Sequence, residues 1–526
     1  MLSDESGTNN DATHEKERGS STMVEDSFFG KSRVFLWAVL LILFGLGFAI
    51  RMVDLTDPPL DFHPTRQLRS AIIARSMYYR NLPQEDNWKR DVAISQYSGE
   101  GIIEPLVLET IVANTYKIIG SDPVWVARIY SSLFWIIGGI GLYFLTSAMT
   151  SPDGGVLATA YYLFVPFGII ASRSFQPDPL MVMLIILAFW AFYYWYRNPS
   201  WKTAILAGAL AGMAMFVKAV ALFPIIFALA GFILFSKGIK KALRDPQVWV
   251  IAVLSVLPMI AYTLYGVFWG SMESQFLGRF FPEFWRDLGF YFSWEDMATG
   301  IVGYGAIFAA LLGMLLFRTA ALRAFGIGLW IGYFIFGMVF PYHFTTHSYY
   351  HLPLIPIVAI TLAPLGALVF KPLATLKPEI LVRILVFGIL LSAIVLKAWD
   401  VRLDLAREDY RHEPAYWENI GEILDHNPSV VGLVHDYGNR LAYYGWLTPK
   451  IWPPLGQQNL RELQGKPAIE VQEWFNKRAG NKDFFLVTMK NQFAKQPELK
   501  ELLYDNFPIY AEGDGYLIFD LRNPLE

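Results

Sequence analysis

Long apolar blocks separated by short polar turns dominate this sequence. A membrane-spanning helix needs about 20 mostly apolar residues, and eleven segments of the chain come close to that requirement. These segments are residues 34–53, 124–146, 154–172, 179–196, 201–217, 219–236, 247–269, 299–317, 321–340, 351–370 and 380–398. Only Lys218 separates the fifth block from the sixth, so these two are the least distinct. The pattern predicts a polytopic α-helical membrane protein with about eleven spans.

The composition supports lipid as the solvent for much of the chain. Hydrophobic residues make up 54% and charged residues 17% of the 526 residues, whereas soluble chains average about 45–50% and about 25%. The net charge of -3 gives no reason to expect nucleic acid, which needs a clustered basic face. The sequence has no cysteine, which excludes disulfides, thiolate catalysis and cysteine-ligated metals. The lipid bilayer is therefore the expected partner, and nucleic acid is not.

Lysine and arginine in the short loops predict the orientation, because cytoplasmic loops are enriched in both. With the N-terminus in the cytoplasm, eleven of these residues fall in inner loops and four in short outer loops. The inner residues are Arg197, Lys202, Lys237, Lys240, Lys241, Arg244, Arg318, Arg323, Lys371, Lys377 and Arg383, and the outer ones are Arg173, Lys218, Arg279 and Arg286. An odd number of spans then places the C-terminus outside. We expect a plasma (inner) membrane protein with an extracytoplasmic C-terminal segment.

Three regions follow from this topology. Residues 1–33 are polar and mixed in charge, which is typical of a disordered cytoplasmic tail. Residues 34–398 hold the spans, and their first block lacks a small-residue cleavage site, so we interpret it as a retained signal anchor. Residues 399–526 alternate strand-like and helical runs. That alternation predicts a small extracytoplasmic α/β domain.

A first group of polar residues follows the first span directly. Asp61, His63 and Arg66 lie there, and Pro64 can begin a helix. We expect that helix to be amphipathic over residues 66–80 and to lie along the membrane surface. Asp61 would then be held at the lipid–water boundary. The alternative is that Asp61 caps the helix.

A second acidic residue stands later in the same large outer loop, residues 54–123. Glu104 precedes Pro105 and opens another amphipathic stretch, residues 104–119. A glutamate at the start of a helix often does no more than complement the helix dipole. The loop therefore predicts two candidate functional carboxylates, each with a structural alternative.

Three more charged residues lie at short outer turns. Arg173 and Asp178 belong to the turn between the third and fourth blocks, where they could pair with each other. Lys218 has almost no loop around it. An ionisable group at membrane depth is costly and usually has a partner or a function, although a lysine can also extend its ammonium to the surface.

Three of the eight histidines lie in one short outer loop. They are His343, His347 and His351, and Tyr349 and Tyr350 lie among them. Histidines spaced by four residues can share a zinc ion on one helix face, so a divalent metal ion is an open alternative. Prolines on both sides argue against a regular helix through the loop, and we assign no metal site. Tyrosines are also common at a bilayer interface.

The predicted orientation places all these groups on one face of the membrane. A surface enzyme gathers its groups at one interface, whereas a transporter places charged groups near the midplane, at broken helices. The pattern therefore favours an enzyme. A lipid or solute transporter is the alternative, and a non-catalytic scaffold that presents the C-terminal domain is a third hypothesis.

These segments resemble the GT-C class of integral-membrane glycosyltransferases, in the branch of protein O-mannosyltransferases and aminoarabinose transferases. The resemblance covers roughly residues 34–370. It rests on Asp61, His63-Pro64 and Arg66-Gln67 followed by Ala71–Arg75, on Glu104-Pro105-Leu106, on Ala127-Arg128, on Arg173 with Pro177-Asp178, and on Tyr349-Tyr350 with Leu352-Pro353. The Lys-Pro-Pro often seen in the aminoarabinose branch is absent near Glu104, which argues against aminoarabinose transfer.

The resemblance implies transfer of a sugar from a polyprenyl-phosphate donor, with inversion, to an acceptor on the outer face; the acceptor could be a glycan, a lipid or a protein. The family has an acidic residue near the start of the first outer loop that serves as catalytic base or electrostatic organiser, and Asp61 matches it. Glu104 resembles a second acidic position. Cations must stabilise the leaving phosphate, and the candidates are Arg66, Arg173 and Lys218. Candidates for the substrate path are His63, Asp178, His347, Tyr349, Tyr350 and His351.

Overall fold

The structure, a computed structural model, describes residues 27–82, 88–101, 103–270, 272 and 279–525. Most of the predicted cytoplasmic tail therefore lies outside the described residues. The chain divides into two compact units. The helical unit comprises the chain up to residue 55 together with 102–107 and 127–407, and the α/β unit comprises 56–101, 108–126 and 408–526.

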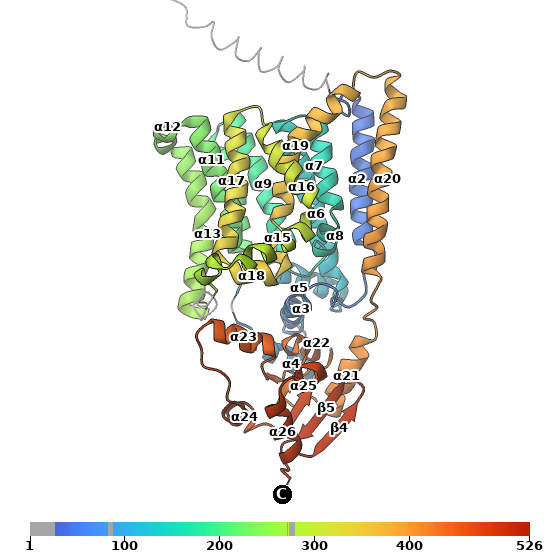
Figure 1. Cartoon of the computed structure of the whole chain (residues 1–526), viewed down its shortest axis with the longest axis vertical. Helices are drawn as coiled ribbons and strands as arrows, with labels where there is room; N and C mark the ends of the chain where they lie inside the picture. The colour runs from blue at the N-terminus through green and yellow to red at the C-terminus, as the bar shows by residue number, and fades with distance from the viewer. Residues whose placement is uncertain (1–26, 83–87, 102, 271, 273–278, 526) are drawn as a thin grey trace, which may run out of the picture. The chain divides into compact units, whose positions relative to one another are not determined.

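Long helices form the body of the helical unit (Figure 1). Within the described residues, eight apolar helical segments are long enough to cross a membrane. They are α2 (Arg33–Arg51), α6 (Trp125–Met149), α9 (Asp178–Arg197), η1 (Ala219–Ala221) with α11 (Leu222–Lys237), α13 (Pro246–Gly270), α17 (Ala320–Val339), η3 (Ser348–His351) with α19 (Leu354–Leu373), and α20 (Glu379–Leu405). These segments confirm a polytopic helical membrane protein.

The other three predicted blocks are also helical, but they are short or broken. Residues 154–172 form α7 (Pro152–Phe164) and α8 (Pro166–Ala171), which are interrupted at a proline that cannot donate a backbone hydrogen bond. α10 (Trp201–Val217) has 17 residues. α15 (Leu288–Val302) and α16 (Tyr304–Leu315) meet at 87°. Gly303 forms this bend with a φ of 84°, which glycine adopts readily. A count of eleven spans stays a prediction.

Small residues allow the helices to approach closely. α17 packs along α11, and a methyl group placed on Gly328 or Gly332 would lie 2.3 Å or 2.5 Å from the carbonyl oxygens of Phe227 and Phe223. Close contact of this kind is typical of membrane helices, which associate through packing. α10 packs against both α9 and α13, and α19 packs against α7 and α16. The remaining short helices of this unit are α12 (Ile239–Arg244), η2 (Pro282–Arg286) and α18 (Pro341–Thr346).

A buried carboxylate fixes the segment before the first long helix. Asp153, in the first turn of α7, is 1% exposed. It accepts hydrogen bonds from the Ser27 hydroxyl at 2.8 Å and from the backbone N–H groups of Phe28 and Phe29 at 2.9 Å and 2.8 Å. The segment that leads into α2 is thereby tied to the start of α7.

The α/β unit is built on a five-stranded mixed sheet with the order β2-β1-β3-β5-β4. β1 pairs parallel with β2 and β3, and β5 pairs antiparallel with β3 and β4. The strands are β1 (Val430–Leu433), β2 (Lys450–Ile451), β3 (Phe484–Val487), β4 (Ile509–Gly513) and β5 (Tyr516–Asp520). The helices are α3 (Pro64–Tyr79), α4 (Trp88–Gly99), α5 (Val107–Ile119, which begins at the unit boundary), α21 (Glu413–Ile423), η4 (His435–Gly438), α22 (Asn439–Tyr444), α23 (Leu455–Leu463), α24 (Val471–Ala479), α25 (Lys490–Ala494) and α26 (Pro497–Asn506). The predicted α/β character of the C-terminal segment is confirmed.

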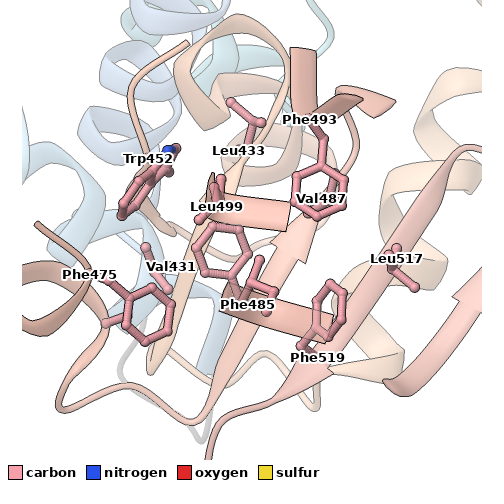
Figure 2. Close-up of a cluster of buried hydrophobic side chains, with 12 residues drawn as sticks. Val431, Leu433, Trp452, Phe475, Phe485, Val487, Phe493, Leu499, Leu517 and Phe519 are labelled. Atoms are coloured by element: carbon pink, nitrogen blue, oxygen red, sulfur yellow. The ribbon is translucent and has the colours of Figure 1, made fainter. Parts of the chain in front are cut away.

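The core of this unit lies between the sheet and its helices (Figure 2). Every residue of β1 and β3 is buried, as expected for short apolar strands that are covered on both faces. Trp452, Phe475 and Phe485 lie at one end of the cluster, and Phe493 and Phe519 lie at the other. Five of the twelve buried residues of this cluster are aromatic, and such large side chains bury much apolar surface in a small core.

The helix after Asp61 differs from the expected amphipathic surface helix. Ten of the sixteen residues of α3 are buried, because α4 and α22 pack against it. Arg75 donates to the carbonyl oxygens of Ala442 and Tyr443 and to the Gln96 side chain, and its guanidinium lies 3.9 Å from the centre of the Trp446 ring. The helix is thus an internal element of the α/β unit. Its polar side chains suggested a solvent-exposed face, but several of them have partners inside the fold.

Candidate functional site

Lys218 lies at the break between α10 and η1, where its backbone is extended. The side chain is 6% exposed, and its Nζ lies 2.8 Å and 2.9 Å from the two carboxylate oxygens of Asp178. Asp178 is 1% exposed and is the first residue of α9, where the helix dipole favours a negative charge. Lys218 therefore does not extend to the surface, and Asp178 pairs with it.

Glu104 lies on another side of the same ammonium. One of its carboxylate oxygens is 4.0 Å from Lys218 Nζ, and its side chain is 16% exposed. α5 begins only at Val107, so Glu104 precedes the helix rather than opening it. The structure thus brings together three residues that the sequence separates widely, and it places one cation between two carboxylates.

Two tyrosines complete the surroundings of Lys218. Its Nζ lies 4.8 Å from the centre of the Tyr349 ring and 5.5 Å from that of Tyr350, and both rings are buried. A cation near an aromatic face is stabilised by the negative charge density of the ring. Tyr349 and Tyr350 belong to η3, which precedes the long helix α19. The two predicted substrate-path tyrosines therefore contact the predicted phosphate-binding lysine.

A cavity of about 290 Å³ opens at Lys218. Its polar lining includes Glu104, Lys218, Arg279 and Tyr350, and most of its wall is apolar. The apolar residues include Ile103, Met215, Phe216, Ala219, Val220, Leu222, Phe223, Met259, Met272 and Phe340. The cavity thus has a mostly apolar lining that includes charged side chains.

His343 and His347 lie beside these tyrosines. The ring centre of His343 is 4.9 Å from that of Tyr350 and 5.2 Å from that of His347. Burial lowers the pKa of His343 to about 3, and the positive charges of Arg279 and Lys218, together with His347, act in the same direction. His343 is therefore neutral near pH 7. His347 shares a hydrogen bond of 2.7 Å with the hydroxyl of Thr346.

His351 has a different environment. It is fully buried, and its ring nitrogens lie 2.6 Å from the Tyr333 hydroxyl and 2.9 Å from the Phe344 carbonyl oxygen. Both nitrogens therefore have partners within the protein, away from the cavity lining. Over the described residues, no three histidine, aspartate or glutamate side chains gather in a way that could hold a metal ion.

Arg173 follows α8 in the sequence and lies beside the end of α2, and it is not among the residues that line the cavity. It is 2% exposed and donates through Nη2 to the carbonyl oxygen of Asp54 at 2.9 Å. Arg128 donates to the same oxygen at 3.0 Å and to the carbonyl oxygen of Leu55 at 3.1 Å. These contacts fix the segment directly after α2, where Asp54 has a left-handed φ of 49°.

Asp61, His63 and Arg66 lie in the α/β unit. The cap position of α3 belongs to His63, which has a left-handed φ of 46°, so Asp61 is not the N-cap residue. Asp61 is exposed, whereas His63 and Arg66 are partly buried. Thr65, the second residue of α3, is fixed by Asn439, whose side chain donates to the Thr65 carbonyl oxygen at 3.1 Å. The Asp61 carboxylate therefore stands at the start of an anchored helix.

Two residues were missed as site residues in the sequence analysis: Arg279, which lines the cavity, and His343, whose ring lies beside that of the cavity residue Tyr350. Arg279 counted only as a loop cation, and His343 counted only as a member of the histidine cluster. The concentration of histidine in one loop was a usable signal for His343. Arg279 had no such signal, because nothing in its local sequence distinguishes it from the other loop cations that indicate membrane orientation.

Comparisons with known proteins bear on the fold and on the family that this chain resembles. The sequence profile of a family described as dolichyl-phosphate-mannose-protein mannosyltransferase matches residues 104–265, a segment that includes Glu104, Asp178 and Lys218. Comparison with curated protein sequences gives no match.

Solved structures share the fold at low sequence identity. ArnT from Cupriavidus metallidurans in the apo state aligns with a TM-score of 0.54 and 15% identity, over 92% of this chain and 97% of that chain. A structure of the same protein bound to undecaprenyl phosphate aligns with a TM-score of 0.53. Archaeal oligosaccharyltransferase AglB from Archaeoglobus fulgidus, in complex with an inhibitory peptide and a dolichol-phosphate, aligns with a TM-score of 0.54 and 12% identity, over 94% of this chain and 74% of that chain. The chain thus has an ArnT-like fold, and its resemblance to the GT-C glycosyltransferases of the protein mannosyltransferase and aminoarabinose transferase branch is confirmed.

Proposed function

We propose that this protein is a glycosyltransferase that moves a sugar from a polyprenyl-phosphate donor to an acceptor on the outer membrane face. The cavity at Lys218 is the observation that carries the proposal. A polyprenyl phosphate has an apolar chain and an anionic head, and the cavity offers both an apolar lining and the cations Lys218 and Arg279. The match of the mannosyltransferase profile to this part of the chain supports the assignment.

The donor phosphate would bind at Lys218. An ammonium has three N–H donors, so the bond to Asp178 leaves capacity for a phosphate oxygen. Arg279 supplies a second cation, and arginine is suited to paired contacts with phosphate. The polyprenyl and dolichol phosphates bound to ArnT and AglB support this choice of donor. Arg66 and Arg173 are further candidates from the sequence, and Arg173 has the additional task of fixing the loop start.

In the proposed reaction, an acceptor oxygen attacks the anomeric carbon of the sugar. The bond from that carbon to the phosphate oxygen breaks, the configuration inverts, and the lipid phosphate leaves with the electron pair. The acceptor proton passes to a general base. We propose Asp61 as that base, because it is an exposed carboxylate at the family's position in the first outer loop. Glu104 is the second acidic candidate.

The remaining polar groups would line the path of the sugar or the lipid. Tyr349 and Tyr350 are proposed for this role because their rings lie near Lys218 Nζ, and His347 because its ring lies near both tyrosines. Asp178 orients Lys218 rather than contacting substrate. His63 is proposed for the same path because it lies close to Asp61 in the sequence. His351, with both nitrogens bonded inside the protein, is the weakest member of this group.

The topology belongs to the same proposal. We infer eleven spans in residues 34–398, a cytoplasmic tail in 1–33 and an extracytoplasmic domain in 399–526. The chain would lie in a plasma (inner) membrane. The asymmetry of lysine and arginine supports this orientation. A reporter that is active only in the cytoplasm, fused after Glu526, should be silent, and a signal would contradict the shared outer face.

The proposed function is tested by incubating the purified protein with a panel of radiolabelled polyprenyl-phosphate sugars and by comparing wild type with Asp61→Asn. Loss of a general base typically costs 10²–10⁴-fold in rate, while the melting temperature should stay unchanged because the side chain is exposed. Asp91→Asn is a matched control, since Asp91 is an exposed aspartate of the same loop.

The outcomes separate the hypotheses. Transfer by Asp61→Asn within a few-fold of wild type would move the base to Glu104. Movement of the lipid across a vesicle membrane without sugar transfer would favour the transporter. Neither activity in a folded protein would favour a scaffold.

A further inference from the structure

A second cavity lies in the α/β unit, beside α23 and α24, the two helices that flank the loop 464–470. It encloses about 220 Å³. The residues that matter for its chemistry are Gln457, Arg461, Gln464, Lys466, Trp474 and Arg478. Three of these six side chains are cationic, and the proposed transfer reaction uses none of them.

The positive charge in this cavity is not compensated. Over the described residues, Arg461, Lys466 and Arg478 form no ion pair with a carboxylate. Arg461 Nε is buried and has no hydrogen-bond partner among the residues that the structure describes. Burial lowers the pKa of Arg478, and the positive charge of Arg461 lowers it further. Two guanidinium groups therefore repel each other in a partly enclosed space, and a bound anion would relieve that repulsion.

The guanidinium groups are held in place before any ligand arrives. The centre of the Trp474 ring lies 4.5 Å from the Arg461 guanidinium carbon and 4.7 Å from that of Arg478. Trp474 packs against the aromatic core that Figure 2 shows. Arg478 Nη1 also donates to the carbonyl oxygen of Ile451. A fixed pair of guanidinium groups loses little conformational entropy when it binds an oxyanion.

The size and the remaining lining indicate more than a bare ion. The volume equals that of roughly seven waters at about 30 Å³ each, which exceeds the need of a single phosphate or carboxylate group. Gln457 adds an amide, which can both donate to and accept from hydroxyl groups. A ligand that combines an oxyanion with hydroxyl groups would match this lining.

We propose that this cavity binds an anionic sugar, either a sugar phosphate or a sugar carboxylate, through Arg461, Arg478 and Lys466. Sugar phosphates and uronic acids share this chemistry. In a glycosyltransferase the bound group would belong to an acidic acceptor glycan. This assignment to the acceptor rests on the proposed function, whereas the binding of an anionic sugar does not.

Binding is tested on the purified full chain by ligand-observed NMR titration with glucose 6-phosphate, glucuronate, inorganic phosphate and neutral glucose. We expect one or both sugar anions to bind at least tenfold more tightly than glucose and phosphate. A hydrogen bond to a charged group contributes about 1.5–3 kcal/mol, so Arg461→Gln should weaken that binding about tenfold or more. Lys466→Gln should weaken it as well.

Two control variants locate the effect. Lys495→Gln removes an exposed cation of the same unit that lies outside the cavity and should bind like wild type. The double variant Lys218→Met/Asp178→Asn, which leaves no buried charge without its partner, should also leave the binding unchanged, which separates this cavity from the proposed donor site. Preference for glucose 6-phosphate or for glucuronate decides between the two sources of the anion.

Three results would overturn the proposal. They are equal binding of glucose and the sugar anions, inorganic phosphate binding as tightly as the sugar anions, and unchanged affinity of a folded Arg461→Gln variant. Because no transfer is measured, a failure here leaves the proposed transferase activity standing, and a failure of transfer leaves this site standing.

Discussion

The two cavities of this protein hold their cations in opposite ways. In the helical unit, Lys218 lies in mostly apolar surroundings with the Asp178 carboxylate 2.8 Å away. In the α/β unit, Arg461 and Arg478 share a tryptophan and have no carboxylate partner among the described residues. A charge that is buried among apolar side chains must carry its own counter-ion, because removing it from water is costly. A charge near the surface of a polar domain can stay uncompensated and so remain available to an anion.

The largest expected effect tests the first half of this comparison. Lys218→Met leaves Asp178 buried without its partner, and breaking a buried pair in this way costs about 3–5 kcal/mol of unfolding free energy. Thermal unfolding in detergent should show a clear loss of stability. The double variant Lys218→Met/Asp178→Asn should recover much of it, because no buried charge is left. Equal stability of the single variant and wild type would mean that water or another cation reaches Asp178.

A smaller effect depends on pH and concerns His343, whose ring lies beside that of Tyr350, a residue of the same cavity. The folded protein keeps His343 neutral, since its pKa is lowered to about 3, whereas the unfolded chain binds a proton below about pH 6.5. Between these values the unfolded state holds more protons, so this histidine makes the protein less stable as the pH falls from about 6.5 towards 3. His343→Asn should therefore show a shallower fall of melting temperature over that range. Parallel curves for variant and wild type would contradict the burial of the ring.

The smallest effect tests the second half of the comparison. Arg461→Gln removes one of two repelling charges and breaks no ion pair, but it also removes the contact of the guanidinium with the Trp474 ring. These two effects oppose each other, so the unfolding free energy should change by no more than about 0.5 kcal/mol. The gain from removing the repulsion should be smaller at high salt, which screens the repulsion. Thermal unfolding at low and high salt measures both. A loss of several kcal/mol would show that Arg461 has a structural partner.

Much of the fold follows from local pattern alone. All eleven apolar blocks form helices, because each helix satisfies its own backbone groups in lipid. The strand-like runs 430–434, 484–488 and 516–521 coincide with β1, β3 and β5. β2 has two residues and β4 is mostly exposed. Neither gives a hydrophobic pattern that sequence reasoning can detect.

The site is less predictable because its contacts join distant parts of the chain. The sequence indicated that Lys218 needs a partner, but Asp178 becomes that partner only when α9 packs on α10. The expected alternatives paired Asp178 with Arg173 or sent Lys218 to the surface. Similarly, α3 has the composition of a surface helix, yet α4 and α22 cover it. Packing between two helices of this kind cannot be predicted from a short stretch of sequence.

The tie between Asp153 and residues 27–29 has a consequence for the depth of the first helix in the bilayer. Only Gly30, Lys31 and Ser32 separate the tied residues from α2, and a methyl group on Gly30 would lie 2.8 Å from Pro152. Such a short connection limits the depth of α2 in the bilayer, because it leaves α2 little freedom to slide along its axis. Each residue of a helix rises 1.5 Å. The position of α2 along the bilayer normal is thus set by α7, and adjusting α2 to a thicker or thinner bilayer would require moving both helices together.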